Sequence, residues 1–326
     1  MRRRALFAAA SASPALGVIG RAAAQDDVWP DRTVLMIVPY APGGSNDVVA
    51  RLLTPGLQAA FRRSFVVENR AGGGGSVGMG QVARARPDGY TLLVSSASNH
   101  VFNHLVVPDQ GYDPRQALSA ISMMVDVPNA LAVHPSLGVA DVQALLSKIR
   151  ATRGGLSFAS TGVGSSNHLA GELLRLRTGV ELNHVPYRGG GPALSDLIAG
   201  TVPMAFLNLP TVLPAHEAGQ VKILGIGGKK RLSSRPDIPT IADQGVPDYE
   251  VQSWTGLFAP SGTPRPVIDR LSLEIRNLLG TPAMRQRLNE LGSEDIWAGP
   301  ADADAFVRAE FDRWTPIVRQ SGATNN

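Results

Sequence analysis

The chain has no cysteine among its 326 residues. Disulfide bridges, thiolate metal ligands and cysteine nucleophiles are therefore excluded, and so is a lipoprotein anchor, which needs a cysteine at the cleavage site. Long apolar segments are also lacking: beyond the N-terminus, no apolar run reaches the roughly 20 residues that a membrane-spanning helix needs. The apolar fraction of 44% is still ordinary for a globular protein, and the length allows one large or two medium α/β domains.

The first 25 residues have the pattern of an export signal. Residues 2–4 are all arginine, residues 5–20 are apolar or small, and residues 22–25 offer small side chains at the cleavage positions. This pattern predicts a signal peptide over residues 1–24, with cleavage after Ala24. The alternative is an N-terminal membrane anchor, which Pro14 and the many small residues disfavour. The basic start also fits a twin-arginine signal loosely, so the export route stays open.

Positive charge is in short supply once this signal is removed. The signal carries four of the 31 basic residues and no acidic one, which leaves 27 basic against 27 acidic residues. A chain without a basic field gives no reason to expect nucleic acid as a partner. Together these features predict a freely soluble protein of the periplasm.

Short apolar runs alternate with longer stretches of helical spacing. The order predicts an α/β fold, with mostly parallel sheets flanked by helices. Pro55 and Gly56 fall inside the first helical stretch, so we expect that helix to end or kink near Leu53. The predicted strands are residues 33–39, 64–70, 90–96, 130–135, 156–160, 202–208, 221–227 and 255–260.

Three strand-to-helix junctions share glycine-rich or serine-rich sequences, at residues 42–45, 160–166 and 187–191. The first turn of a helix has N–H groups without intrahelical partners and the positive end of the helix dipole. Glycine lets a ligand approach these groups closely, and hydroxyl side chains add further donors. Two or three such helix ends at one cleft predict a site for an anion, most simply a carboxylate, that needs no lysine or arginine. The alternative is that these residues only cap their helices.

Residues 73–78 read Gly-Gly-Gly-Ser-Val-Gly and match two glycine motifs. The dinucleotide motif lacks the acidic residue at the end of the next strand, so we expect no nucleotide cofactor. The hydrolase motif would make Ser76 a nucleophile, with Asp196 and His216 nominally completing a triad. The surrounding glycines make this turn loose, which favours a helix N-cap as the role of Ser76. A secreted serine hydrolase using Ser76 remains an alternative function.

The six histidines are scattered along the chain. His100 and His104 are four residues apart, but the residues between them lack the glutamate of a zinc-protease helix. We therefore expect neither a metal site nor any other cofactor. His168 lies in the first turn after the 160–166 junction, where it is either a polar residue that faces a ligand or an ordinary surface histidine.

Several long motifs resemble those of one family. The stretch "ENRAGGGGSVGMGQVARARPDGYTLL" and the opening "VPYAPGGSNDVVARLL" are similar, in order and in detail, to the Bug-type solute receptors of the tripartite tricarboxylate transporter family. The similarity extends over nearly the whole mature chain. The segments that carry it are 29–53, 66–93, 111–137, 157–174, 184–200 and 251–271.

This resemblance implies a periplasmic-binding-protein fold of type II, with two α/β domains and a ligand cleft between them. The first domain would be discontinuous, over residues 26–135 plus 253–326, and the second would cover residues 136–252. The implied function is not enzymatic. The protein would capture a small carboxylate-bearing solute, such as a di- or tricarboxylate, an aromatic acid or an amino acid, and close around it.

The resemblance also implies ligand-binding positions in both domains. In the first domain they follow two strands. In the second they form a loop that would clamp the carboxylate, and a turn that would close the cleft. Asp47 would either cap its helix, which is slightly favoured, or bind a polar ligand group. The positions are Tyr40, Pro42, Gly43, Gly44, Asp47, Ser95, Ser96, Asn99, Ser160, Gly162, Ser165, Ser166, His168, Tyr187, Arg188 and Gly189.

One departure from the family concerns residues 200–210. The family often has aspartate where this chain has Pro203 and Leu207. If Leu207 faces the ligand, the pocket is less polar than usual, and an aromatic or aliphatic acid suits it better than an amino acid. The sequence leaves open which acid binds and whether the partner is a membrane transporter or a signalling system. A monomer is expected from the fold.

Overall fold

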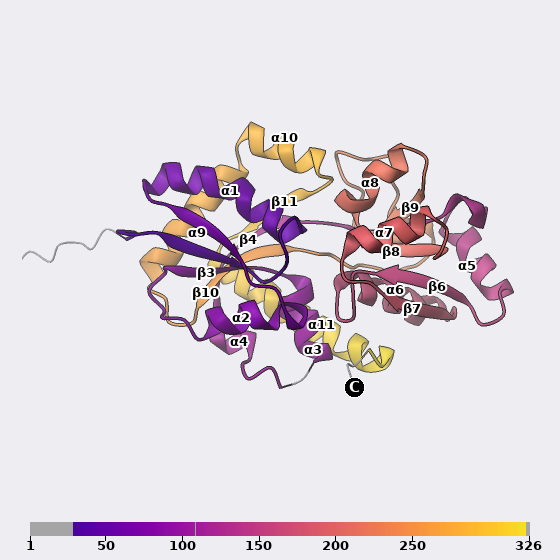
Figure 1. Cartoon of the computed structure of the whole chain (residues 1–326), viewed down its shortest axis with the longest axis horizontal. Helices are drawn as coiled ribbons and strands as arrows, with labels where there is room; N and C mark the ends of the chain where they lie inside the picture. The colour runs from indigo at the N-terminus through magenta and orange to yellow at the C-terminus, as the bar shows by residue number, and fades with distance from the viewer. Residues whose placement is uncertain (1–28, 108, 324–326) are drawn as a thin grey trace, which may run out of the picture.

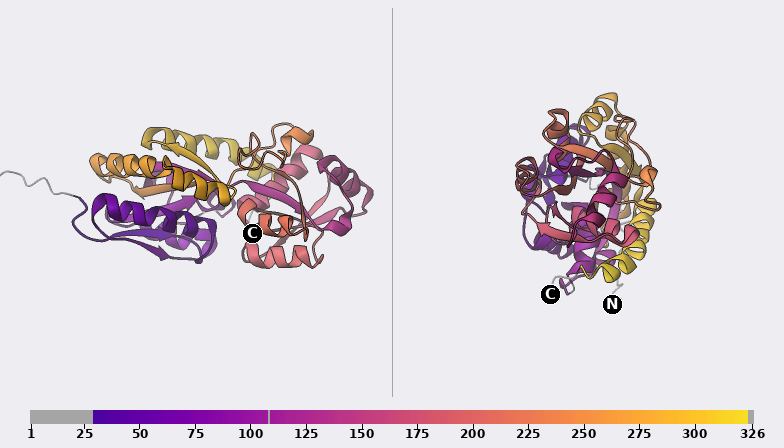
Figure 2. Two further views of the ribbon diagram at one scale, coloured as in Figure 1. Left: turned by 90° about the horizontal axis from the view of Figure 1, so that it is seen from above. Right: turned by 90° about the vertical axis from the view of Figure 1, so that its right-hand side faces the viewer.

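The computed structural model describes residues 29–107 and 109–323, so the predicted signal over residues 1–24 lies outside the described residues. The protein has two lobes that follow one another along the long axis, each built on one sheet with helices around it (Figure 1). The view from above shows the same arrangement (Figure 2). Within the described ranges, no helix is long and apolar enough to cross a membrane.

The first lobe contains a six-stranded sheet in the order β11-β4-β10-β3-β1-β2. Strands β1, β2 and β3 are parallel, whereas β10 runs antiparallel to both β3 and β4. The strands are β1 (Val34–Val38), β2 (Phe65–Asn69), β3 (Thr91–Ser96), β4 (Leu118–Asp126), β10 (Thr255–Pro260) and β11 (Glu294–Ala298). The helices are α1 (Ser45–Phe61), α2 (Ser76–Ala83), α3 (Asn103–Val106), α4 (Pro114–Ala117), α9 (Arg265–Leu279), α10 (Pro282–Glu290) and α11 (Pro300–Ser321).

Alternation along the strands sends apolar side chains to both faces of this sheet. Met36 of β1 packs in the cluster under α1 and α9, while its neighbour Ile37 packs in the cluster that contains residues of α2 and α11. Both side chains are fully buried. The first lobe is therefore a three-layer α/β structure, as the alternating pattern of the sequence predicts.

The second lobe contains a five-stranded sheet in the order β7-β6-β8-β5-β9. Strands β7, β6 and β8 are parallel, and β5 runs antiparallel to β8 and β9. The strands are β5 (Asn129–Val133), β6 (Leu156–Ser160), β7 (Leu182–Pro186), β8 (Met204–Asn208) and β9 (Lys222–Ile226). The helices are α5 (Val142–Ala151), α6 (Ser166–Thr178), α7 (Gly190–Ile198) and α8 (Leu209–Glu217).

Every strand predicted from the sequence is present, and β4, β7 and β11 were missed. The prediction of mostly parallel sheets is confirmed for β1–β3 and β6–β8 but is wrong for β5, β10 and β11, which run antiparallel to their neighbours. Strands β5 and β10 each enter their sheet from the other lobe, next to the carboxyl ends of the parallel strands. A strand that begins where its neighbours end has to be antiparallel to them.

The chain crosses between the lobes at two adjacent segments. Outward it passes from β4 to β5, and on its return it enters β10. Pro128 and Gln252 pair as an antiparallel bridge, which holds the two crossing segments together. Residues 129–133 form β5 of the second sheet, so the outward crossing comes earlier in the chain than the sequence analysis places it. At the C-terminus, α11 also reaches the second lobe, where Arg175 donates a 3.0 Å hydrogen bond to the carbonyl of Ser321.

The first helix does not end near Leu53, contrary to the prediction. Helix α1 continues through Pro55 to Phe61. Its buried side chains, which include Leu53 and Leu57, extend across the proline. Gly56 faces α9 so closely that a Cβ there would lie 2.2 Å from a terminal carbon of Leu278. Packing on both sides of Pro55 therefore outweighs the hydrogen bond that the proline removes.

Gly78 has a packing role that accounts for part of the glycine-rich stretch. It lies in α2, close to the end of β1. A Cβ on Gly78 would lie 2.8 Å from the carbonyl oxygen of Arg70 and 3.0 Å from the Cα of Pro39. Both neighbours are backbone atoms, so neither moves aside as a flexible side chain would.

We expect Gly78→Ala to lower the free energy of unfolding by about 1–3 kcal/mol, because the added methyl group overpacks this contact. In an open helix the same change would instead add about 1 kcal/mol. Urea unfolding measures the difference. Gly80→Ala in the same helix is the control, since the nearest atom to a Cβ there is the end of the flexible Arg84 side chain, at 3.0 Å. A Gly78→Ala variant as stable as the parent would contradict the close packing.

Asp126 ends β4 at the outward crossing and is buried. In the antiparallel pair of β4 and β11 it lies directly opposite Glu294. Burial, followed by the charges of Glu294 and Glu250, raises the pKa of Asp126 to about 7. Its Oδ1 has no hydrogen-bond partner in the part of the chain that the structure describes. The carboxyl group therefore favours its neutral form next to the crossing.

Because the pKa of Asp126 is higher in the folded protein than its ordinary value of 3.8, folding stability should fall as the pH rises from about 4 through 7. An asparagine side chain cannot ionise, so Asp126→Asn should be no more stable than the parent at pH 4 and more stable at pH 8, by a few kcal/mol at most. Urea unfolding between pH 4 and 8 measures this. The exposed Asp237→Asn is the control, and parallel pH profiles for Asp126→Asn and the parent would show that Asp126 does not titrate in this range.

Candidate functional site

The predicted junctions of the two lobes meet at their interface. The Oγ of Ser45, at the start of α1, accepts a 3.4 Å hydrogen bond from the side-chain amide of Asn208, at the end of β8. The Oγ of Ser98 accepts a 3.0 Å bond from the backbone N–H of Ser166, at the start of α6. These contacts come from four different strand ends or helix starts. The helix N-termini of α1 and α6 therefore face the same region.

The N-terminus of α1 is open. Its N-cap is Gly44, and no side chain caps the first turn. The preceding Gly43 has a φ of 85°, a conformation that favours glycine. The exposed Pro42 completes this loop. The first-turn N–H groups thus carry the positive end of the helix dipole without a protein acceptor from a capping side chain.

Asp47 holds this loop in place. Its carboxylate accepts hydrogen bonds from the N–H of Gly43 at 2.9 Å, from Arg51 at 3.0 Å and from Asn69 at 3.0 Å. Burial would raise the pKa of Asp47, but these hydrogen bonds outweigh it and keep the pKa below its ordinary value. These contacts tie Asp47 to its own helix and loop and to the end of β2, which favours a structural role over ligand contact.

Asn46 is a candidate that the sequence analysis missed. It lies in the first turn of α1, and only 3% of it is exposed. Its Oδ1 accepts a 3.3 Å bond from Thr255, the first residue of β10. Its Nδ2 is buried without a hydrogen-bond partner among the described residues. A free amide donor therefore lies in the same turn as the open N–H groups of α1.

The predicted residues at the end of β3 form a buried network. Asn99 accepts bonds from the N–H and the hydroxyl of Ser96, at 2.9 and 3.0 Å, and donates to Ser95 at 2.9 Å. Ser95 also bonds His100 Nδ1 at 3.1 Å, and burial lowers the pKa of His100 to about 3. Tyr40 lies nearby, 3.5 Å from the carbonyl of Gly74, and burial raises its pKa. These groups are neutral and already hydrogen-bonded to one another.

In the second lobe, the loop between β6 and α6 is closely bonded. Ser165 is the N-cap of α6 and accepts a 3.1 Å bond from the N–H of His168. Its hydroxyl donates to the carbonyl of Gly162 at 2.6 Å. Ser160 accepts a 3.1 Å bond from the N–H of Gly162. Ser166, at the start of α6, is 1% exposed and contacts the first lobe through Ser98.

Three asparagines join these elements at the interface, and the sequence analysis missed all of them. Asn129 and Asn208 are direct partners in the β5–β8 ladder. Asn167 of α6 donates from its side chain to both, at 3.2 Å to Asn208 and through a shorter contact to Asn129. Ser166 donates to the same Asn129 oxygen at 3.3 Å. The strand ends in the sequence carry these residues, but only the sheet order brings them together.

The third junction lies beside α7. Tyr187 donates a 2.6 Å hydrogen bond to Asp196, and burial, followed by this bond, raises the pKa of Tyr187 to about 12. Arg188 is exposed, and Gly189 is the N-cap of α7 with a φ of 114°. Leu207 is fully buried within an apolar cluster of the second lobe. Its neighbour Asn208, and not Leu207, places a polar group at the lobe interface.

Ser76, Asp196 and His216 are not hydrogen-bonded to one another as a hydrolase triad would be. Ser76 is the first residue of α2 and Gly75 is the N-cap, so the N-cap role predicted for Ser76 is wrong. Asp196 accepts a hydrogen bond from Tyr187. The Nδ1 of His216 accepts a hydrogen bond from the N–H of Ile223 in β9 and lies 3.4 Å from the carbonyl oxygen of Val221. Across residues 29–107 and 109–323, no group of histidines and carboxylates is arranged to hold a metal ion.

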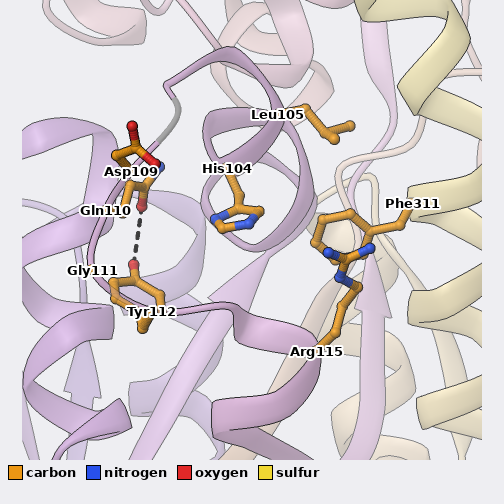
Figure 3. A pocket seen from close by; sticks show the side chains of 8 residues that line it. All are labelled: His104, Leu105, Asp109, Gln110, Gly111, Tyr112, Arg115 and Phe311. Carbon is orange, nitrogen blue, oxygen red and sulfur yellow. Dashed lines mark hydrogen bonds between the residues drawn. The ribbon is translucent and has the colours of Figure 1, made fainter.

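A surface pocket of about 410 Å³ lies elsewhere on the first lobe, beside α3 and α11. Its lining includes His104, Tyr112 and Phe311 (Figure 3). Arg115 lies over the ring of Phe311 and is paired with Asp113 at 2.7 Å. None of the predicted ligand-binding residues lines this pocket.

Comparison with known proteins agrees with the resemblance seen in the sequence. Residues 49–323 match the model of the family described as "Tripartite tricarboxylate transporter family receptor". The chain is 37% identical over 298 residues to Protein BugT of Bordetella pertussis, which covers 91% of each chain. It is also similar to the solved structure of an R. palustris protein with adipate, with 37% identity and a TM-score of 0.84 over 90% of this chain and 98% of the other.

Two further solved structures share the fold. MatC from Rhodopseudomonas palustris with bound malate is 32% identical, with a TM-score of 0.80 over 89% of this chain and 100% of the other. The periplasmic binding protein BugD is 32% identical, with a TM-score of 0.81 over 91% of this chain and 100% of the other. The predicted periplasmic-binding-protein fold is thus confirmed, and the chain belongs to the family of solute-binding receptors of tripartite tricarboxylate transporters.

Proposed function

We propose that this protein is exported to the periplasm and captures a small dicarboxylate between its two lobes, for delivery to a membrane transporter of the tripartite tricarboxylate type. The observation that supports this most directly is the meeting of two helix N-termini from different lobes. Ser45 begins α1 and Ser166 begins α6, and both contact the opposite lobe. The first turn of α1 has no capping side chain, whereas at α6 the N–H groups of Ser166 and His168 already bond Ser98 and Ser165. Both helix ends carry a partial positive charge that attracts an anion.

The donors around this region are neutral. The free Nδ2 of Asn46 adds to the N–H groups of α1. At α6 the polar side chains of Asn167 and Ser166 are also uncharged, and here they donate to Asn129. In a buried, water-poor setting such oriented dipoles bind a carboxylate more strongly than they do in water. Because the donors come from both lobes, the full set is complete only when the lobes are together, so ligand binding favours closure.

Two opposed helix ends suit a ligand with two carboxylates. The similarity to receptors solved with adipate and malate supports this ligand class. An amino acid would also need a carboxylate for its ammonium group. Asp47 is the single acid among the predicted site residues, and its oxygens already bind Gly43, Arg51 and Asn69. The site therefore favours an acid without a cationic group, and it needs no catalytic residue.

The test is a thermal-shift panel on the mature chain, first unfolded and refolded to remove carried-over ligand. Adipate, malate and citrate are compared with benzoate and glutamate. A ligand at about 100 times its dissociation constant adds roughly 2.7 kcal/mol to stability, which is seen as a rise in melting temperature. A rise with dicarboxylates supports the proposal. If no carboxylate changes the melting temperature, the proposal is wrong.

Asn46→Asp tests the position of the anion. An acidic side chain in the first turn interacts favourably with the helix dipole, which offsets part of the cost of burying its charge at this 3% exposed position. It should weaken dicarboxylate binding on the order of 100-fold or more, because two like charges would lie close together with little water. Titration calorimetry measures the affinity. Asn277→Asp, exposed on α9, changes the net charge equally and is the control. Unchanged affinity in Asn46→Asp would place the anion elsewhere.

A further inference from the structure

Two histidines stack beneath the loop that connects β6 to α6. The rings of His168 and His184 are 3.9 Å apart with an angle of 17° between their planes. The ring of Phe158 stacks on the other side of His184, at 5.0 Å. The three side chains come from α6, β7 and β6, and the register pairs Phe158 directly with His184. The result is a column of three rings that spans neighbouring elements.

Each histidine anchors one part of the loop. His168 Nδ1 accepts a 3.2 Å hydrogen bond from the N–H of Gly164. His184 Nε2 lies 2.6 Å from the hydroxyl of Ser160, which in turn accepts the N–H of Gly162 at 3.1 Å. Gly162 and Gly164 have φ angles of 129° and 73°, so the backbone of this loop is flexible without such anchors.

The anchoring fixes the protonation state of the rings. Because His168 accepts at Nδ1, its hydrogen has to be on Nε2, which lies 3.9 Å from a carboxylate oxygen of Glu172. Arg175 pairs with the same Glu172 at 2.7 Å, so the carboxylate beside His168 already has a cationic partner. Burial lowers the pKa of His168 to about 4. Burial, followed by the charge of His168, lowers the pKa of His184 to about 3.

We propose that His168 and His184 are a neutral pair of positioning residues: they hold the loop at residues 160–165 in the shape that presents the N-terminus of α6 to the ligand, and they act through that loop without touching the ligand. This inference rests on the proposed function. It gives His168 a different role from the ligand contact that the sequence suggested, and it adds His184, which the sequence analysis did not select. The expected consequence is that affinity depends on ring nitrogens that contact only the protein.

The first test needs no ligand. Nitrogen-15 NMR of the imidazole rings in the mature protein reports which nitrogen carries the hydrogen and whether each ring titrates. We expect His168 to carry its hydrogen on Nε2, and both rings to stay neutral from pH 8 down to pH 5. A His168 ring that carries its hydrogen on Nδ1, or that titrates near its ordinary pKa of 6.5, would overturn the proposal.

The second test is a double-mutant cycle with adipate as the probe. His184→Phe keeps the stacking but loses the ring nitrogens. Ser160→Ala removes the same contact and also the oxygen that accepts the N–H of Gly162. We expect His184→Phe to weaken adipate binding about 10-fold, and the double variant to bind no more weakly than Ser160→Ala alone, because the two changes break one chain of contacts. His134→Asn, at a histidine whose side chain bonds Ser136, is the control.

The outcomes separate the two proposals. If the parent protein binds no carboxylate, the proposed function is wrong. The NMR experiment still tests whether His168 and His184 are neutral and bonded to the loop. If the parent binds adipate and the folded His184→Phe and Ser160→Ala variants bind it equally well, the positioning role is wrong. Losses that multiply in the double variant would likewise show that the two residues act separately. Should His184→Phe not fold, Ser160→Ala and the NMR experiment remain decisive.

Discussion

The structure depends on one constraint: the chain passes twice between two sheets, at adjacent segments. Strands β5 and β10 therefore enter their sheets from the lobe interface, and they run against the neighbouring strands that end there. For the same reason the ends of β1, β6 and β8 point to the interface, and the helices that follow begin there. The crossing thus determines both the strand directions and the place where helix N-termini from the two lobes meet.

The proposed site, built from neutral donors, has a requirement that a charged site lacks. The attraction between a lysine and a carboxylate falls slowly with distance and depends little on angle, whereas an N–H group helps only when it points at its acceptor. The loops that carry the donors must therefore be held in place. In the first lobe Asp47 does this as an anion bound by three donors. In the second lobe two neutral histidines contact the loop. A carboxylate in one lobe and two imidazole rings in the other thus each hold a loop in place.

The sequence predicts features that depend on local pattern. Buried apolar runs such as 34–38 and 255–260 were recognised as strands, whereas the half-buried edge strand 294–298 was missed because its pattern is mixed. The strand over residues 118–126 was also missed although it is buried, because Ser119 and Ser122 interrupt its apolar residues. The helix ends that face the interface were found from their glycines and serines. Asn46, Asn129 and Asn208 were not found, because their hydrogen-bond partners come from helices and strands far away in the chain. His184 was missed for the same reason, since its contact with Ser160 follows from strand register.

Several buried ionisable groups at or near the interface favour their neutral forms. The pKa of His100 and His168 is lowered and that of Asp126 is raised, in each case mainly by burial. These neutral groups would not compensate the charge of a bound carboxylate, so its stabilisation would come from the oriented dipoles. A fixed cation would attract any anion, even to one open lobe. Oriented dipoles from both lobes give their full stabilisation only to a ligand of matching length in the closed form, so specificity and closure have the same physical origin.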